Sequence, residues 1–153
     1  VIYYNRRRRS PQEENGAAYV SFDELLATAD VIVVLVPLNE DSRGLFGAAE
    51  FAKMKKTALF INAARGAIVK TEALYAAVKE GVIAGCALDV TDPEPIPASH
   101  PLLQLPNVFV TPHIGSATLE TRNRMAMLAA ENLILGLKKK PLKTCVNQSV
   151  NYR

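Results

Sequence analysis

Cysteine is scarce in this chain. Cys86 and Cys145 are the only two cysteines among the 153 residues, and their separation does not match the spacing of metal ligands. Cys86 lies in an apolar run and is predicted to be a small core residue. We therefore expect no metal site, and this cysteine usage predicts a reducing compartment, the cytoplasm.

Long apolar runs and a strong net charge are also absent. The longest apolar run, near Val31–Val36, is far too short to span a bilayer, and no signal peptide is expected. The net charge of +3 is modest and does not imply a nucleic-acid partner. We expect neither a membrane nor a nucleic acid as partner. Hydrophobic residues make up 49% of the chain, which is enough for one domain-sized core.

Apolar runs alternate along the chain with helical patterns. Val31–Val36 is apolar throughout, which is typical of a strand that is buried on both faces. Alternating strands and helices predict an α/β fold with a parallel sheet covered on both faces. We expect strands at residues 1–4, 18–20, 31–36, 58–63, 85–90 and 107–111, and helices at residues 22–29, 47–54, 71–80 and 119–137. Residues 5–16 are predicted to form a polar turn.

Ligands of such folds bind at the carboxyl ends of the strands. These ends hold Asn5 with the arginines after it, Pro37, and residues 63–66, 89–94 and 111–116. The set contains arginines, carboxylates and a histidine, which hydride transfer to a carbonyl acid requires. An arginine binds the carboxylate or carbonyl oxygen of the substrate, a histidine delivers the proton, and a carboxylate orients the histidine.

Three segments at these ends carry a specific pattern: INAARG at residues 61–66, ALDVTDPEP at 87–95 and TPHIGSAT at 111–118. Together they resemble the signature of the D-isomer-specific 2-hydroxyacid dehydrogenase family, and within it the glyoxylate/hydroxypyruvate reductases. The resemblance runs from Val1 to about Lys140. It implies a doubly wound, Rossmann-like NAD(P)-binding domain and the reduction of a small 2-keto acid.

The resemblance also implies roles for single residues. Arg65 would bind and polarise the 2-keto acid, His113 would donate the proton to its carbonyl oxygen, and Glu94 would pair with the imidazole. Positions that line the cofactor in the family match Pro37, Ala63, Asp89 and Gly115. Ser116 would lie near the substrate with Arg65, although a helix-entry role is equally compatible with its position.

The family's G-x-G-x-x-G phosphate loop has no counterpart in this sequence. Val1–Tyr4 resembles the second strand of the domain, so we expect an incomplete sheet that lacks its first strand. Residues 1–117 would be the C-terminal part of the NAD(P)-binding domain. Residues 118–153 would be a long helix and tail that return toward a substrate-binding domain absent from the chain. The chain alone is expected to be inactive, and the resemblance implies a homodimer at full length.

Four consecutive arginines, Arg6 to Arg9, follow the first expected strand. They have three interpretations: a nuclear-localisation or nucleic-acid patch, a solvated turn, or a site for the 2′-phosphate of NADP. Folds that prefer NAD place an acid at the end of the second strand, where this chain has Asn5. We therefore favour NADPH over NADH, with Arg6 and Arg7 at the phosphate, and predict that Arg8 and Arg9 are solvated.

Two other functions stay open at this point. One is a regulatory NAD-binding protein that resembles the transcriptional corepressors of this fold, which keep much of the catalytic set. The other is an NAD-linked relative of phosphoglycerate dehydrogenase. A preference for NADPH discriminates against both.

Overall fold

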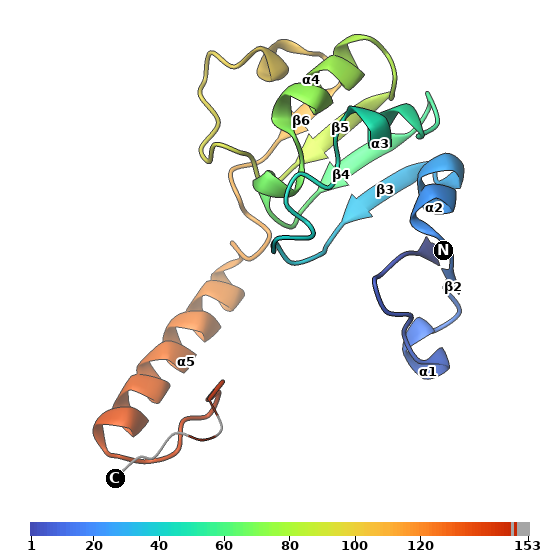
Figure 1. Cartoon of the computed structure of the whole chain (residues 1–153). Helices are drawn as coiled ribbons and strands as arrows, with labels where there is room; N and C mark the ends of the chain where they lie inside the picture. Colours follow the sequence, from blue (N-terminus) through green and yellow to red (C-terminus); the bar gives the residue numbers. More distant parts are fainter. Residues whose placement is uncertain (148, 150–153) are drawn as a thin grey trace. The chain divides into compact units, whose positions relative to one another are not determined.

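The computed structural model describes residues 1–147 and residue 149. The chain divides into two compact units, Val1–Pro112 and His113–Arg153, and each is described by itself (Figure 1).

Six parallel strands form two sheets in the first unit. The smaller sheet pairs β1 with β2, and the larger sheet has the order β3-β4-β5-β6. The strands are β1 Ile2–Tyr3, β2 Ala18–Tyr19, β3 Val31–Val34, β4 Leu59–Asn62, β5 Gly85–Leu88 and β6 Val108–Val110. The predicted parallel α/β fold is confirmed. No ladder among the described residues joins β1 to β3, which are the two strands between which the sequence predicts a missing strand.

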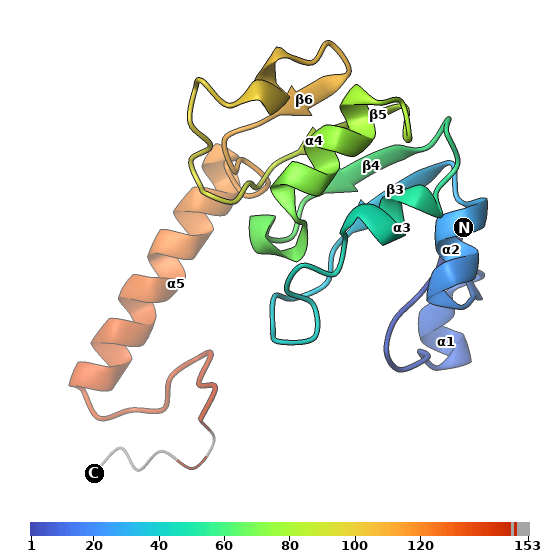
Figure 2. The ribbon, with the colours of Figure 1, turned by 45° about the horizontal axis from the view of Figure 1, so that its top comes forward.

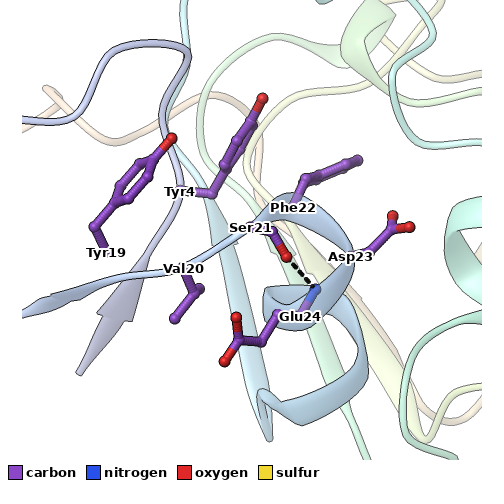
Figure 3. A pocket seen from close by; sticks show the side chains of 7 residues that line it. All are labelled: Tyr4, Tyr19, Val20, Ser21, Phe22, Asp23 and Glu24. Atoms are coloured by element: carbon purple, nitrogen blue, oxygen red, sulfur yellow. Dashed lines mark hydrogen bonds between the residues drawn. The ribbon is translucent and has the colours of Figure 1, made fainter.

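Helices connect these strands at the positions that the apolar pattern predicts. They are α2 Phe22–Thr28, α3 Ala48–Ala52 and α4 Thr71–Lys79, with 3₁₀ turns η1 Gly66–Ile68 and η2 Pro101–Gln104. Ser21 caps α2, because its hydroxyl accepts a hydrogen bond of 3.2 Å from the amide of Glu24 (Figure 3). Gly81 follows α4 with a φ of 68°, a left-handed conformation that glycine adopts without steric cost.

A short helix, α1 Pro11–Glu14, lies within the segment that was expected to be only a polar turn. Ser10 precedes it, and Glu13 turns back so that its carboxylate accepts hydrogen bonds from the amide and the hydroxyl of Ser10. A proline at the first helical position and an acid three residues after the cap are signals of a helix start. These signals are present in the sequence, so the prediction of a polar turn is wrong at residues 11–14.

The larger sheet has one covered face and one open face. The covered face joins the core through Ile32, Val34, Phe60, Cys86 and Leu88, which pack with Leu26 of α2, Phe51 of α3 and Leu74 of α4. On the opposite face, the side chains of Val31 and Val33 are 48% and 51% exposed. The prediction that residues 31–36 are buried on both faces is therefore wrong for this chain. The reason is that α2, α3 and α4 all contribute to one core, and Figure 2 shows α3 and α4 on one side of the strands.

The second unit contains the long helix α5, Leu119–Leu137, whose bounds match the predicted ones. Thr118 caps it by accepting a hydrogen bond of 3.2 Å from the amide of Thr121. Of the expected segment 118–153, residues 148 and 150–153 lie outside the described residues. In the described part of the chain, no helix combines the length and the apolar character needed to cross a membrane.

Candidate active site

The backbone around Arg65 is fixed by a buried polar side chain. Asn62, at the end of β4, is only 1% exposed. Its amide nitrogen donates to the carbonyl of Arg65 at 3.0 Å, and its oxygen accepts from the amide of Ala64 at 3.1 Å. The guanidinium of Arg65 also donates to the carbonyl of Ala64 at 2.6 Å. Asn62 is not among the site residues predicted from the sequence, although a polar residue at the end of an apolar strand is a signal, since buried polar groups need partners.

The segment that carries Glu94 packs directly on the backbone that follows Arg65. A Cβ atom added to Gly66 would lie 1.9 Å from the carbonyl oxygen of Thr91, so only glycine fits there. The amide of Thr91 donates to the Glu94 carboxylate at 3.3 Å, and the hydroxyl of Thr71 donates to the carbonyl of Asp92 at 2.8 Å. The structure thus brings the segments of Arg65 and Glu94 into contact.

Asp89 lies at the carboxyl end of β5. Its carboxylate accepts a hydrogen bond of 2.6 Å from the hydroxyl of Thr111, which follows β6. This bond links two neighbouring strand ends at the edge where ligands of such sheets bind. On the same strand, burial raises the pKa of the Cys86 thiol to about 12. Cys86 therefore stays protonated and acts as the core residue that the sequence predicts.

Three predicted site residues line one cleft of about 490 Å³. Pro37, Ala63 and Arg65 share this cleft with Leu35, Val36, Leu38 and Ala64. Pro37 is positioned by the buried Ser42, whose hydroxyl donates to the carbonyl of Pro37 at 2.7 Å. The ends of β3 and β4 therefore form a common wall.

A second cleft, of about 500 Å³, brings Arg6 to the same end of β3. Its polar lining includes Asn5, Arg6, Arg9 and Asp41, and Pro37 lines it together with apolar side chains. Leu35, Val36 and Pro37 line both clefts, so the two are neighbours along the end of β3. At the rim of the second cleft, the guanidinium of Arg6 forms an ion pair with Asp41, which is not among the site residues predicted from the sequence.

The four arginines have different partners. Arg8 donates to both carboxylate oxygens of Glu14, at 2.7 and 3.2 Å, and Arg9 lies 3.5 Å from Glu13. Both side chains are exposed, as predicted, but they are also folded back onto α1. Within residues 1–147 and 149, neither an ion pair nor a hydrogen bond involves the side chain of Arg7.

Two tyrosines bind the two ends of the arginine turn, which comprises residues 5–9. The hydroxyl of Tyr19 donates to the carbonyl of Asn5 at 3.1 Å. The hydroxyl of Tyr3 accepts from the amide of Arg9 at 3.0 Å and donates to Glu14 at 2.6 Å. Hydrogen bonds from Arg8 and Tyr3 lower the pKa of Glu14 from its ordinary value of 4.5 to about 2. Hydrogen bonds of Tyr3 and Tyr19 therefore order the backbone at both ends of the turn.

A further hollow, of about 590 Å³, lies beside the start of α2 (Figure 3). Tyr4, Tyr19 and Phe22 line it together with Val20, Ser21, Asp23 and Glu24, and the rings of Tyr4 and Phe22 lie 5.2 Å apart. None of the predicted site residues lines this hollow, so its size does not make it a candidate site.

The remaining predicted residues, His113, Gly115 and Ser116, open the second unit. His113 has a φ of 54°, in the left-handed region that few residues other than glycine adopt. Ser116 lies two residues before Thr118, the cap of α5. The catalytic role of His113, the cofactor contact of Gly115 and the substrate contact of Ser116 stay predictions.

Comparison with known families decides what kind of domain this is. Residues 1–115 match the sequence model of the D-isomer specific 2-hydroxyacid dehydrogenase, NAD binding domain. The chain belongs to this family. The family resemblance that the three strand-end segments carry is therefore confirmed.

Individual relatives give the same result. The chain is 51% identical over 151 residues to glyoxylate/hydroxypyruvate reductase B of Citrobacter koseri, an alignment that covers 97% of this chain and 47% of the relative. The crystal structure of the TT0316 protein from Thermus thermophilus superposes with a TM-score of 0.89 at 42% identity, over 95% of this chain and 45% of that one. The crystal structure of a glyoxylate reductase from Paecilomyes thermophila superposes with a TM-score of 0.86 at 41% identity, over 97% of this chain and 45% of that one. The chain thus spans about half the length of the curated relatives it matches.

Proposed function

We propose that this chain is the C-terminal part of an NADPH-dependent reductase of small 2-keto acids, with glyoxylate and hydroxypyruvate as substrates. The observation that carries the proposal is the pair of neighbouring clefts that meet at Pro37, with Arg6 on one and Arg65 on the other. An elongated dinucleotide fits such an arrangement, with one end at each guanidinium. The names of the relatives from Citrobacter koseri and Paecilomyes thermophila support the substrate class.

The reaction assigns one task to each residue of the proposed catalytic set. Arg65 binds the carboxylate and polarises the carbonyl of the 2-keto acid, and its backbone is held by Asn62 for this purpose. NADPH, when bound, supplies the hydride. His113 donates the proton to the carbonyl oxygen, and Glu94 keeps the imidazole oriented and protonated.

The remaining assignments concern the cofactor and the substrate. Ala63, Pro37, Asp89 and Gly115 line the cofactor, and Ser116 contacts the substrate with Arg65. Pro37 and Ala63 are supported by their place in the cleft of Arg65, and Asp89 by its place at the end of β5.

The preference for NADPH rests on how the arginines are partnered. Arg8 is held by both carboxylate oxygens of Glu14, whereas Arg6 and Arg9 line the cleft and Arg7 has no ion pair among the described residues. In that cleft Arg6 pairs with the exposed Asp41. Asn5, rather than an acid, lies at the end of β1, so no carboxylate at that position repels a 2′-phosphate. Arg6 and Arg7 are therefore the phosphate ligands.

The domain organisation and the assembly belong to the same proposal. Residues 1–117 are the C-terminal part of the cofactor domain, and residues 118–153 lead back to a substrate-binding domain. The full-length enzyme is a homodimer in the cytoplasm, and this chain alone has no turnover.

The decisive experiment changes Arg6 and Arg7 to Ala together in the full-length protein and compares kcat/KM for NADPH and NADH. A charge-assisted hydrogen bond contributes about 1.5–3 kcal/mol, and because both guanidiniums are exposed we expect the two together to contribute about that much. The value of kcat/KM for NADPH should therefore fall roughly 10- to 100-fold. The value for NADH should change by less than about threefold, the range of a single exposed ion pair. The control is Arg8→Ala, which removes an arginine of the same run that is paired with Glu14 and does not line the cleft of Arg6. Equal losses with NADPH and NADH, or equal losses in the control, contradict the assignment. A protein that binds NADH with equal affinity and has no turnover would be the regulatory alternative.

A further inference from the structure

An acidic side chain reaches the proposed phosphate site from a part of the chain that the family motifs do not include. Asp41 lies in the loop between β3 and α3, more than thirty residues after the arginine turn. It lines the same cleft as Asn5 and Arg6, and its carboxylate pairs with the guanidinium of Arg6. Both side chains are about two-thirds exposed, at 67% and 66%, so the pair is solvated and its partners can separate.

The loop that carries Asp41 is anchored on both sides of it. The buried Ser42 donates its hydroxyl hydrogen to the carbonyl of Pro37 and accepts a hydrogen bond of 2.8 Å from the amide of Asn39. The side-chain oxygen of Asn39 accepts from the amide of Ser42 at 3.0 Å. The amide of Gly44 donates to the carbonyl of Ala67 at 2.8 Å. Because the backbone is fixed, the Asp41 carboxylate stays at the rim of the cleft when Arg6 takes another partner.

We propose that Asp41 sets the discrimination between NADPH and NADH, because it competes with the 2′-phosphate for Arg6. The proposal rests on the proposed function, in which Arg6 is a phosphate ligand. A phosphate that pairs with Arg6 must displace Asp41 and then lies near its negative charge, which weakens NADPH binding. NADH has no 2′-phosphate, so the Arg6–Asp41 pair persists when NADH binds. Asp41 thus places a carboxylate near the cofactor site, where Asn5 provides none. Its negative charge keeps the preference for NADPH over NADH moderate.

The test replaces Asp41 by Asn in the full-length protein and measures dissociation constants by nucleotide fluorescence or calorimetry. The probes are NADPH, NADH, adenosine 2′,5′-bisphosphate and 5′-AMP. Since exposed charge pairs change affinities by about two- to fivefold, Asp41→Asn should tighten NADPH and adenosine 2′,5′-bisphosphate by that factor. NADH and 5′-AMP should bind with unchanged affinity. The matched control is Glu40→Gln, which removes the same charge from the adjacent exposed residue and should change none of the four constants by more than about 1.5-fold, since Glu40 has no ion pair among the described residues.

Arg6→Ala and the double change Arg6→Ala with Asp41→Asn separate this proposal from the proposed function. If Asp41 competes for Arg6, the gain from Asp41→Asn disappears in the Arg6→Ala background. If Arg6→Ala weakens NADPH selectively while Asp41→Asn has no effect or weakens NADPH, the competition is refuted and the function stands. A gain that survives in full without Arg6 also refutes the competition. If Arg6→Ala weakens NADPH and NADH equally, the NADPH assignment itself fails.

Discussion

The arginine turn after β1 and the Arg65 segment after β4 both lie at strand ends, but they are held in different ways. Ion pairs of exposed guanidiniums and tyrosine hydroxyls order the turn, as the contacts of Arg8 and Tyr3 with the half-buried Glu14 show. The segment of Arg65 is held by the buried side chain of Asn62 and by the contact of Gly66 with the Thr91 backbone. Exposed pairs contribute about 0–1 kcal/mol each, whereas a buried polar group that loses its partner costs about 1–3 kcal/mol.

Because of this difference, we expect cofactor choice and catalytic turnover to depend on different regions of the molecule. Side chains of the turn can be replaced at little cost in folding free energy, because few of their contacts reach the core. The backbone that carries Arg65 and the segment of Glu94 is locked by groups that tolerate almost no replacement. We therefore expect variants of the first region to change which cofactor is used, and variants of the second region to change turnover or folding.

The largest expected effect is on turnover. His113→Ala in the full-length protein should lower kcat by about 10²- to 10⁴-fold, the usual contribution of general acid catalysis, and leave the dissociation constant of NADPH within about twofold. The matched comparison is the double change of Arg6 and Arg7 to Ala, which should alter NADPH binding and leave kcat at saturating NADH unchanged. Steady-state kinetics and nucleotide titration measure both. A His113 variant that loses NADPH affinity in parallel with kcat would break the separation.

The next effect concerns folding and compares two glycines, one in each region. Gly66→Ala places a methyl group 1.9 Å from a backbone oxygen, so the segment around Thr91 must move. We expect a loss of at least about 3 kcal/mol in the free energy of unfolding, together with loss of turnover, because the segment of Glu94 moves. Gly16, between α1 and β2, has nothing within 4 Å of the added methyl group and a φ of 85°. Its change to Ala should cost only about 1 kcal/mol. Urea unfolding of both variants checks this, and equal losses would contradict it.

The sequence predicts most of the larger sheet because the signals there are local. The apolar runs at β3, β4 and β5 and the capping residue of α5, Thr118, depend only on neighbouring residues. The strand-end segments INAARG and ALDVTDPEP are short and follow buried strands, so the positions of Arg65 and Glu94 follow from the strand assignment. Both segments follow strands that the structure contains, and the backbone of Gly66 lies against that of Thr91, so the two segments are in contact.

What the sequence does not predict depends on contacts between distant segments. The exposed face of Val31 and Val33 results from which helices reach the sheet, and β3 alone contains no information about them. The pair of Arg6 with Asp41 joins residues 35 positions apart, in the segments that follow β1 and β3, two strands that do not pair with each other. Helix α1 is a different case, since the cap at Ser10 was a local signal that the neighbouring charge run obscured.

The smallest expected effect is the pH dependence of the arginine turn, which depends on Glu14. The folded pKa of Glu14 is about 2, well below its ordinary value of 4.5, since Arg8 and Tyr3 donate hydrogen bonds to the carboxylate. A lowered folded pKa stabilises the folded turn above about pH 4.5, and this contribution is lost as the pH falls toward 2.

Glu14→Gln removes the charge at every pH. Hydrogen exchange at the amide of Arg9, which donates to Tyr3, should therefore be faster in the variant at pH 6, and the difference should shrink as the pH falls from about 4.5 toward 2. Amides of β4 and β5 should exchange at unchanged rates, because the hydrogen-bond partners of Glu14 are Tyr3 and Arg8 and neither belongs to these strands. The control Glu24→Gln removes an acid from α2, and Arg9 exchange should not respond to it. Slower Arg9 exchange in Glu14→Gln would show that Glu14 does not stabilise the turn. Faster exchange in β4 would show that the turn and the core are coupled, so that cofactor choice cannot be changed independently of the fold.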